Sequence, residues 1–472
     1  MPERAQLGFS AWAFAFAFLC AVAMLAVTVG MPSRAGSLSR IVVRGGTLID
    51  GSGSSPLQDS VVVIDGERIL AVGPRSEIEV PYARVIDASG KWIIPGLIDA
   101  HVHFFQSGGI YTRPDIIDLR EVISYGRELA GIRERLAGTF RRYLCGGVTS
   151  VVDVGGPFEN FRVRALASNR EAAPHVAVAG PLVSTYEPDN LPANDPDIIP
   201  VETPEEARSL VRREAAEMPD LVKVWFVLGP GASVAELEPI VRAAIEESHA
   251  QKVRAAVHAT ELETAKAAVR AGADILVHGV SDRPVDDEFI QMVKERGVIY
   301  TTTLVVFEGY DKVFGQQATL TDVDRTCGDP EVIATWADLA KMGYPPRRLS
   351  GGSEELKIAS ANLKRMQEAG AIIAAGTDAG NIGTLHGPAI HREFELMAAA
   401  GLTPIEILVA ATRNAARVFR SSPEMGTIEP GKLADLVILD ADPTADIRNA
   451  RKINKVIKSG RIFEHVSLVG GF

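Results

Sequence analysis

Residues 94–104, IPGLIDAHVHF, decide the fold of this chain. An apolar run that begins at a Pro-Gly pair predicts a buried strand. Because side chains alternate along a strand, His101 and His103 project to the same face, about 7 Å apart. Neutral imidazole is the commonest nitrogen ligand of protein-bound metals. The stretch therefore offers the start of a metal site, although a His-x-His pair alone is more often two ordinary polar strand residues.

Length and composition limit the class of protein. A chain of 472 residues can hold a barrel of about 250 residues and an accessory domain. The apolar fraction of 46% and the 43 glycines are typical of a globular α/β protein. The net charge of −11 and the lack of a basic stripe exclude nucleic acid as an expected partner. We expect a small-molecule substrate, and a homo-oligomer stays open.

The N-terminal segment is expected to direct export. Residues 7–31 are almost wholly apolar and follow Arg4, and the small-x-small site Ser33-Arg34-Ala35 fits signal cleavage, so residues 1–35 are predicted to be a signal peptide. This places the protein in the periplasm or outside the cell. The alternative is an uncleaved membrane anchor, because about 25 apolar residues can span a bilayer.

The cysteines match no zinc-binding pattern. Cys20 lies in the apolar N-terminal segment, which leaves Cys145 and Cys327. We expect buried free thiols at these two positions. One disulfide between them is the alternative after export.

Beyond the N-terminal segment, the chain divides into three parts. Residues 36–95 show short apolar runs separated by turn residues, with Asp65-Gly66 as a hairpin signal. Residues 96–425 alternate strand and helix, and residues 426–472 return to short strands that resemble the first part. The fold class is therefore predicted to be α/β, with a (β/α)₈ TIM-type barrel and a small β-sandwich domain built from both chain ends. The eight predicted barrel strands are 97–104, 148–154, 175–179, 221–227, 253–258, 275–278, 298–304 and 371–376.

Ionisable side chains gather at the ends of these predicted strands. Catalytic groups of a barrel lie at the carboxyl ends of its strands. Six such residues stand at or near these strand ends, and one of them, Lys223, interrupts an apolar strand. Each of the six taken alone has an ordinary structural explanation. Together they do not, because burying a lysine, an aspartate and four imidazoles without a metal would cost many kcal/mol. The six residues are His101, His103, Lys223, His258, His278 and Asp378.

This pattern resembles the binuclear branch of the amidohydrolase superfamily of metal-dependent hydrolases. The resemblance covers residues 41–463 and is carried by PGLIDAHVH at 95–103, GTDAG at 376–380 and GTIEPGKLADLV at 426–437. Residues 278–288 are similar to the peptidase- and imidazolonepropionase-like members. The loop after the third predicted strand, residues 180–186, departs from the Thr-Gly-Gly-His-Gly loop of many peptidase-like relatives, so their specificity does not transfer directly.

The resemblance implies a complete metal site. His101, His103 and Asp378 would hold one divalent ion and His258 and His278 the second, with Zn²⁺ as the favoured metal. Lys223 would bridge the two ions as a CO₂-derived carbamate. A metal-bridging hydroxide would attack the carbonyl of a non-aromatic carbon–nitrogen bond, with Asp378 as general base and then acid.

Substrate and reaction type stay less defined. Dipeptides, N-acyl amino acids and cyclic amides are the candidate substrates, and a lactone or ester hydrolase is an alternative. A mononuclear deaminase is another alternative, because Glu261 follows His258 by three residues, although acidic residues also begin helices. Residues 305–356 are predicted to be a turn-rich insertion that could cover the barrel mouth. Candidate pocket residues are Tyr186, Trp225 and His386, with Arg113 and Tyr310 as further candidates.

Overall fold

The computed structural model describes residues 40–79, 83–190, 196–347, 352–419 and 422–469. The predicted signal peptide or anchor of residues 1–35 lies outside these ranges. Within them, no helix is both long and apolar enough to cross a membrane.

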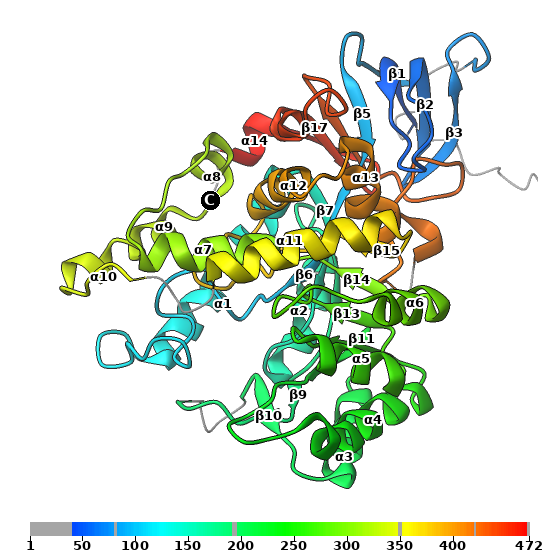
Figure 1. Cartoon of the computed structure of the whole chain (residues 1–472). Helices are drawn as coiled ribbons and strands as arrows, with labels where there is room; N and C mark the ends of the chain where they lie inside the picture. The colour runs from blue at the N-terminus through cyan, green and yellow to red at the C-terminus, as the bar shows by residue number, and fades with distance from the viewer. Residues whose placement is uncertain (1–39, 80–82, 191–195, 348–351, 420–421, 470–472) are drawn as a thin grey trace, which may run out of the picture. The chain divides into compact units, whose positions relative to one another are not determined.

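The first sheet is built from both ends of the described chain (Figure 1). Its hydrogen-bonded order is β18-β17-β16-β5-β1-β2-β3, and β4 pairs with β1. Asp65-Gly66 connects β2 to β3 in the predicted hairpin. The antiparallel pairing of β5 with β16 joins the two chain ends, as the sequence predicts. The strands are β1 (Arg40–Leu48), β2 (Leu57–Asp65), β3 (Arg68–Pro74), β4 (Arg84–Asp87), β5 (Trp92–Pro95), β16 (Leu436–Leu439), β17 (Ile453–Lys458) and β18 (Arg461–Glu464).

Two further sheets are entirely parallel. One has the order β6-β7-β8 and the other β10-β9-β11-β12-β13-β14-β15. Each of the eight predicted barrel strands corresponds to one of these strands, and the short β9 and β10 are additional. The strands are β6 (Leu97–Val102), β7 (Val148–Asp153), β8 (His175–Val178), β9 (Leu182–Ser184), β10 (Ile198–Pro200), β11 (Leu221–Trp225), β12 (Arg254–His258), β13 (Ile275–Val277), β14 (Ile299–Thr301) and β15 (Ile372–Ala374).

Backbone hydrogen bonds connect the two parallel sheets. The amide of Ala100 in β6 donates to the carbonyl of Ala375 after β15 (3.0 Å). The amide of Asp220, just before β11, donates to the carbonyl of Val178 in β8 (2.9 Å). These bonds bring the carboxyl ends of strands far apart in the sequence to one region, where polar side chains at strand ends can meet.

Helices alternate with the parallel strands and follow the expected capping chemistry. Thr203 and Ser233 form capping boxes at the starts of α3 and α4, and Gly272 ends α5 in the left-handed conformation (φ 105°). These features fix where the helices begin and end. The helices between strands are α1 (Tyr125–Cys145), α2 (Phe161–Ser168), α3 (Pro204–Ala215), α4 (Val234–Ala250), α5 (Leu262–Ala271), α6 (Asp287–Arg296), α12 (Ala389–Ala399) and α13 (Pro404–Val409).

The insertion after β14 contains short helices joined by turns, and the sequence analysis predicted the turns but not the helices. Thr321 and Asp329 supply helix caps within what had the composition of a loop, so short helices form between the turns. The long α11 runs alongside α7 (Figure 1). The insertion contains α7 (Leu304–Phe314), α8 (Asp322–Cys327), α9 (Pro330–Thr335), α10 (Asp338–Lys341) and the start of α11 (Gly352–Glu368).

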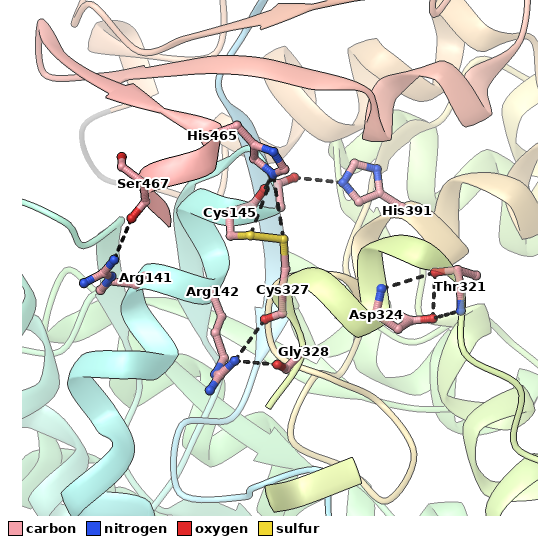
Figure 2. The surroundings of a disulfide bond; sticks show 11 residues. Arg141, Arg142, Cys145, Thr321, Asp324, Cys327, Gly328, His391, His465 and Ser467 are labelled. Atoms are coloured by element: carbon pink, nitrogen blue, oxygen red, sulfur yellow. Dashed lines mark hydrogen bonds between the residues drawn. A yellow bond between two sulfur atoms is a disulfide. The ribbon is translucent and has the colours of Figure 1, made fainter. Parts of the chain in front are cut away.

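The expectation of free thiols at Cys145 and Cys327 was wrong. The two cysteines form a disulfide between α1 and α8, with a Cα–Cα distance of 5.6 Å (Figure 2). His465 in the C-terminal α14 (His465–Val469) lies against both sulfur atoms. The cysteines are 182 residues apart in sequence, and only the folding of the insertion against α1 brings them together.

Candidate active site

The six predicted ligand residues come from the carboxyl ends of five parallel strands. His101 lies at the end of β6 with His103 just beyond it, Lys223 lies within β11, and His258 ends β12. His278 and Asp378 follow β13 and β15, and both have positive φ values, 71° and 60°. Left-handed backbone is uncommon for residues other than glycine and is frequent at functional sites. All six side chains are brought together.

Contacts within the cluster are close. Asp378 Oδ1 lies 3.4 Å from His101 Nε2 and 3.3 Å from His103 Nε2. The imidazole centroids of His101 and His278 are 4.5 Å apart, and those of His258 and His278 are 4.6 Å apart. Lys223, 1% exposed, lines the same cavity as four of the other five residues.

The donor set fits a cation. Both ring nitrogens of His101 and Oδ1 of Asp378 are buried without a hydrogen-bond partner among the described residues. One donor atom each from His101, His103 and Asp378 lies within 4.8 Å of the other two. Buried polar atoms are nearly always satisfied, so a lone pair of the His101 ring and the Asp378 carboxylate that converge without partners fit a bound cation. Imidazole nitrogen and carboxylate oxygen are suitable ligands for a divalent metal such as zinc.

Backbone and hydroxyl groups behind the cluster orient two of the rings. His103 Nδ1 lies 2.7 Å from the carbonyl of Gly155, so it donates there and leaves Nε2 directed at Asp378. His278 Nδ1 lies 2.8 Å from Oγ1 of Thr303. Neither Gly155 nor Thr303 was predicted from the sequence, because nothing in the local pattern marks a residue that supports a ligand from another strand.

Burial dominates the protonation of the cluster. Burial, assisted by Lys223, lowers the pKa of His101 to about 3, so this ring is neutral at pH 7. Burial also lowers the pKa of Lys223 to about 7, against the attraction of Asp378 and Asp153. Burial opposes ionisation of Asp378, but the surrounding imidazoles hold the pKa of its carboxyl well below the usual range. The cluster thus presents neutral rings, a carboxylate and an amine that can lose its proton.

A cavity of about 340 Å³ opens onto the cluster. Trp225 at the end of β11 lies on one side, and α7 contributes Val306, Phe307 and Tyr310. Arg113, one of the further candidates, also lines the cavity. A volume of this size with a mostly apolar lining is typical of a site for a small organic molecule.

Two of the candidate pocket residues lie elsewhere. Tyr186 packs against Trp225, with ring centroids 6.1 Å apart, and does not itself line the cavity. The ring of His386 is buried between the hydroxyl of Tyr143 (2.7 Å) and the carbonyl of Gln106 (2.8 Å). Both of its nitrogens are therefore used within the protein, and His386 does not line the cavity.

Glu261 is engaged at the start of a helix. It is the residue before α5, and its carboxylate accepts a hydrogen bond from Oγ1 of Thr264 (2.9 Å). The neighbouring Thr260 lines the cavity, whereas Glu261 does not. This arrangement agrees with the helix-start interpretation of Glu261 over a proton-shuttling role.

Comparison with known proteins identifies the family of the chain. The model of the Amidohydrolase family matches residues 92–463. The chain is 25% identical over 459 residues to an ochratoxinase of Aspergillus niger, covering 90% of this chain and 86% of that protein. It is 25% identical over 448 residues to an imidazolonepropionase of Brevibacillus brevis, covering 86% and 91%.

A solved structure of a related protein has a similar fold. The crystal structure of a Xaa-Pro dipeptidase with methionine in its active site superposes with a TM-score of 0.69 at 27% identity. The match covers 90% of this chain and all of that one, 100%. The chain therefore belongs to the amidohydrolase family and is a hydrolase that acts on carbon–nitrogen bonds.

Proposed function

We propose that the enzyme hydrolyses a non-aromatic amide bond of a small molecule and that two divalent metal ions, most favourably Zn²⁺, assist it. The observation that carries this proposal is the convergence of unsatisfied buried ligand atoms, above all those of His101 and Asp378, in the cluster of six ligand candidates. Five of the six line the cavity, and we call the cluster the cavity floor. Groups of this kind are costly to bury unless a cation binds them.

The ligand set divides into two halves. His101, His103 and Asp378 would hold one ion, and His258 and His278 the other. When bound, the ions would polarise the scissile carbonyl and lower the pKa of water towards 7. Neutral imidazoles are required for this role, and the burial that lowers the pKa of His101 to about 3 meets that requirement.

Lys223 would contribute as a carbamate. Its neutral amine attacks the carbon of CO₂, a nitrogen–carbon bond forms, and the nitrogen releases one proton to water. The product is an anionic oxygen ligand, which an ammonium group cannot be. The burial of Lys223 and the lowering of its pKa to about 7 support this step, because only the unprotonated amine is nucleophilic.

Asp378 would move the proton during hydrolysis. Its carboxylate takes a proton from the attacking water and then delivers it to the leaving nitrogen, so the same residue acts as general base and general acid. Trp225 and Phe307 would hold the apolar part of the substrate and exclude bulk water. Dipeptides, N-acyl amino acids and cyclic amides are the substrates to examine first, and the similarity to a Xaa-Pro dipeptidase supports the dipeptides among them.

The wider architecture and location belong to the same proposal. We propose that the parallel sheets close into one (β/α)₈ barrel over residues 96–425, which the backbone bonds at Ala100 and Asp220 support. Residues 36–95 and 426–472 would form the small β-sandwich domain. The Cys145–Cys327 disulfide supports export by an N-terminal signal, because disulfides persist in oxidising compartments.

Metal analysis of the purified protein tests the central point. We expect two divalent ions per chain, and one or none in Lys223→Ala and Lys223→Arg. The Arg variant keeps the charge but cannot form the carbamate. Both should lose at least about 1,000-fold in kcat/KM towards a cleaved amide. The control Lys357→Ala changes a residue whose side chain is 73% exposed and should alter neither value. Full activity with two ions in Lys223→Ala would contradict the proposal.

A further inference from the structure

The charged residues that line the cavity beyond the metal-ligand cluster are predominantly acidic. Among the described residues these are one cation, Arg113, and three carboxylates, Asp197, Asp311 and Glu355. A substrate bound in the cavity therefore lies close to this set of charges as well as to the reacting groups. Which substrate charge the cavity favours depends on how far other protein groups already neutralise each of these four side chains.

Arg113 is already neutralised by the protein. Its Nε and Nη2 donate to the two carboxylate oxygens of Asp115 at 2.8 and 2.5 Å, and Nη1 donates to Oδ1 of Asn381. Asp197 is a second carboxylate close enough to act on the guanidinium, since it raises the pKa of Arg113 together with Asp115. A bidentate carboxylate pair leaves an arginine with little attraction for another anion. Arg113 is therefore poorly suited to recognise a free carboxylate on the substrate.

Asp311 and Glu355 have no cationic side chain as an ion-pair partner among the described residues. Oδ1 of Asp311 is buried without a hydrogen-bond partner there. Asp311 on α7 faces the beginning of α11, where a Cβ on Gly352 would lie 2.9 Å from its Oδ1. The positive end of α11 stabilises one carboxylate there.

The positive end of α11 can offset the charge of Asp311, but a second carboxylate, that of Glu355, lies in the same region. Glu355 lies in the first turn of α11 and lines the same cavity as Asp311. Burial raises the pKa of Glu355, and Asp311 and Glu261 raise it further. Like charges that destabilise one another are stabilised when a cation lies between them.

We infer that Asp311 and Glu355 determine specificity, and that the enzyme prefers amides whose non-reacting part carries an ammonium or guanidinium group over neutral or anionic ones. This inference rests on the proposed amide hydrolysis at the same cavity. It separates the candidate substrates, because an N-acyl amino acid with only a free carboxylate would be disfavoured.

Binding and hydrolysis of a matched charge series test the inference on the metal-loaded full chain. The ligands are 6-aminohexanamide, hexanamide and adipic acid monoamide, whose affinities are measured by calorimetry. The corresponding 4-nitroanilides report hydrolysis, and a second series carries the same three groups on the amine side of the amide. We expect the cationic member to bind and react about tenfold better than the neutral one, and the anionic member to be the poorest.

Variants assign the preference to the two carboxylates. Asp311→Asn combined with Glu355→Gln should bring the cationic-to-neutral ratio to within about twofold of one. Glu354→Gln is the matched control, because Glu354 lies in the same turn of α11, is 68% exposed and pairs with Lys357 instead of lining the cavity. The control should keep the ratio.

The outcomes separate this inference from the proposed function. An equal or anion-favouring affinity in the wild-type chain, or an unchanged ratio in the double variant, would overturn the inference whether or not any amide is cleaved. Cation-selective binding that the double variant loses would support it. If such binding occurs without hydrolysis of any member in either series, the specificity stands and the proposed amide hydrolysis fails.

Discussion

The cavity floor and the eight-stranded sheet handle polar groups in opposite ways. In the sheet, apolar side chains such as Ile64 and Ile93 are fully buried, and ion pairs such as Arg40–Asp65 lie on the outside. At the cavity floor, His101 and Asp378 are buried with atoms that have no partner. The sheet therefore contributes stability through apolar burial, whereas the cavity floor gives up stability to keep ligand atoms available.

The largest expected effect tests the cavity side of this comparison. Asp378→Asn keeps the shape of the side chain but removes its charge and its ability to accept a proton. We expect kcat/KM to fall by about 1,000-fold or more and metal content to decrease. The metal-free variant should unfold within a few degrees of the metal-free wild type, because the cost of burying the carboxylate and its attraction to the surrounding imidazoles act in opposite directions. Asp322→Asn, at a side chain that is 100% exposed, is the control. A metal-free variant with a much lower unfolding temperature would show that Asp378 serves stability.

A substitution in the eight-stranded sheet should lower stability and leave activity unchanged. Ile93→Ala removes a side chain that is 0% exposed and leaves a cavity in a core with no spare polar partner. We expect the free energy of unfolding to fall by about 3–4 kcal/mol, measured by denaturant titration, while kcat/KM per folded molecule stays within about twofold. Val85→Ala in the same sheet, at a residue that is 48% exposed, should cost less than about 1 kcal/mol. Loss of activity in folded Ile93→Ala would contradict the assignment of stability to the sheet and of activity to the cavity floor.

The disulfide adds a stabilising element that lies outside both regions. It joins α1 to the insertion, and 182 residues separate its two cysteines. Replacing both, Cys145→Ala with Cys327→Ala, should lower the free energy of unfolding by about 2–4 kcal/mol, because the unfolded chain is no longer cross-linked. Reducing the wild-type chain with dithiothreitol should reproduce the loss and should leave the double variant unchanged. Equal stability of the oxidised and reduced wild type would count against a stabilising role.

The parts of the fold that could be predicted are those set by local sequence. Several of the eight predicted barrel strands are short apolar runs, as β13 and β15 are, and most of the ligand candidates are ionisable residues at or just beyond strand ends, as His258 is in β12. Capping residues such as Thr203 fix helix starts through neighbours only three residues away. These features need no knowledge of which segments meet in space.

The parts that could not be predicted depend on contacts between distant segments. The hydrogen bond from Arg113 to Asn381 spans 268 residues, and that from Tyr143 to His386 spans 243. The latter bond is why His386 lies outside the cavity although it follows Asp378 closely in sequence. No local pattern distinguishes a histidine that binds substrate from one that a distant tyrosine holds in place.

A buried carboxylate that does not line the cavity tests whether the contrast between the two regions applies to the rest of the molecule. Glu214 in α3 is 0% exposed, and both of its carboxylate oxygens lack a hydrogen-bond partner among the described residues. Burial raises its pKa well above the usual range, against a smaller effect of Arg213. The folded state therefore holds a proton that the unfolded chain releases above pH 4.5, so stability falls as the pH rises beyond that value.

Removing that charge should stabilise the protein without changing catalysis. Glu214→Gln should raise the free energy of unfolding by about 1 kcal/mol at pH 8 and leave it unchanged at pH 4, where the carboxyl is protonated in both states. Glu205→Gln on the same helix, with a side chain that is 74% exposed, should have no such pH-dependent effect. Denaturant titrations at the two pH values, with kcat/KM measured alongside, check the prediction. A change in kcat/KM would mean that unpaired buried groups outside the cavity also take part in function.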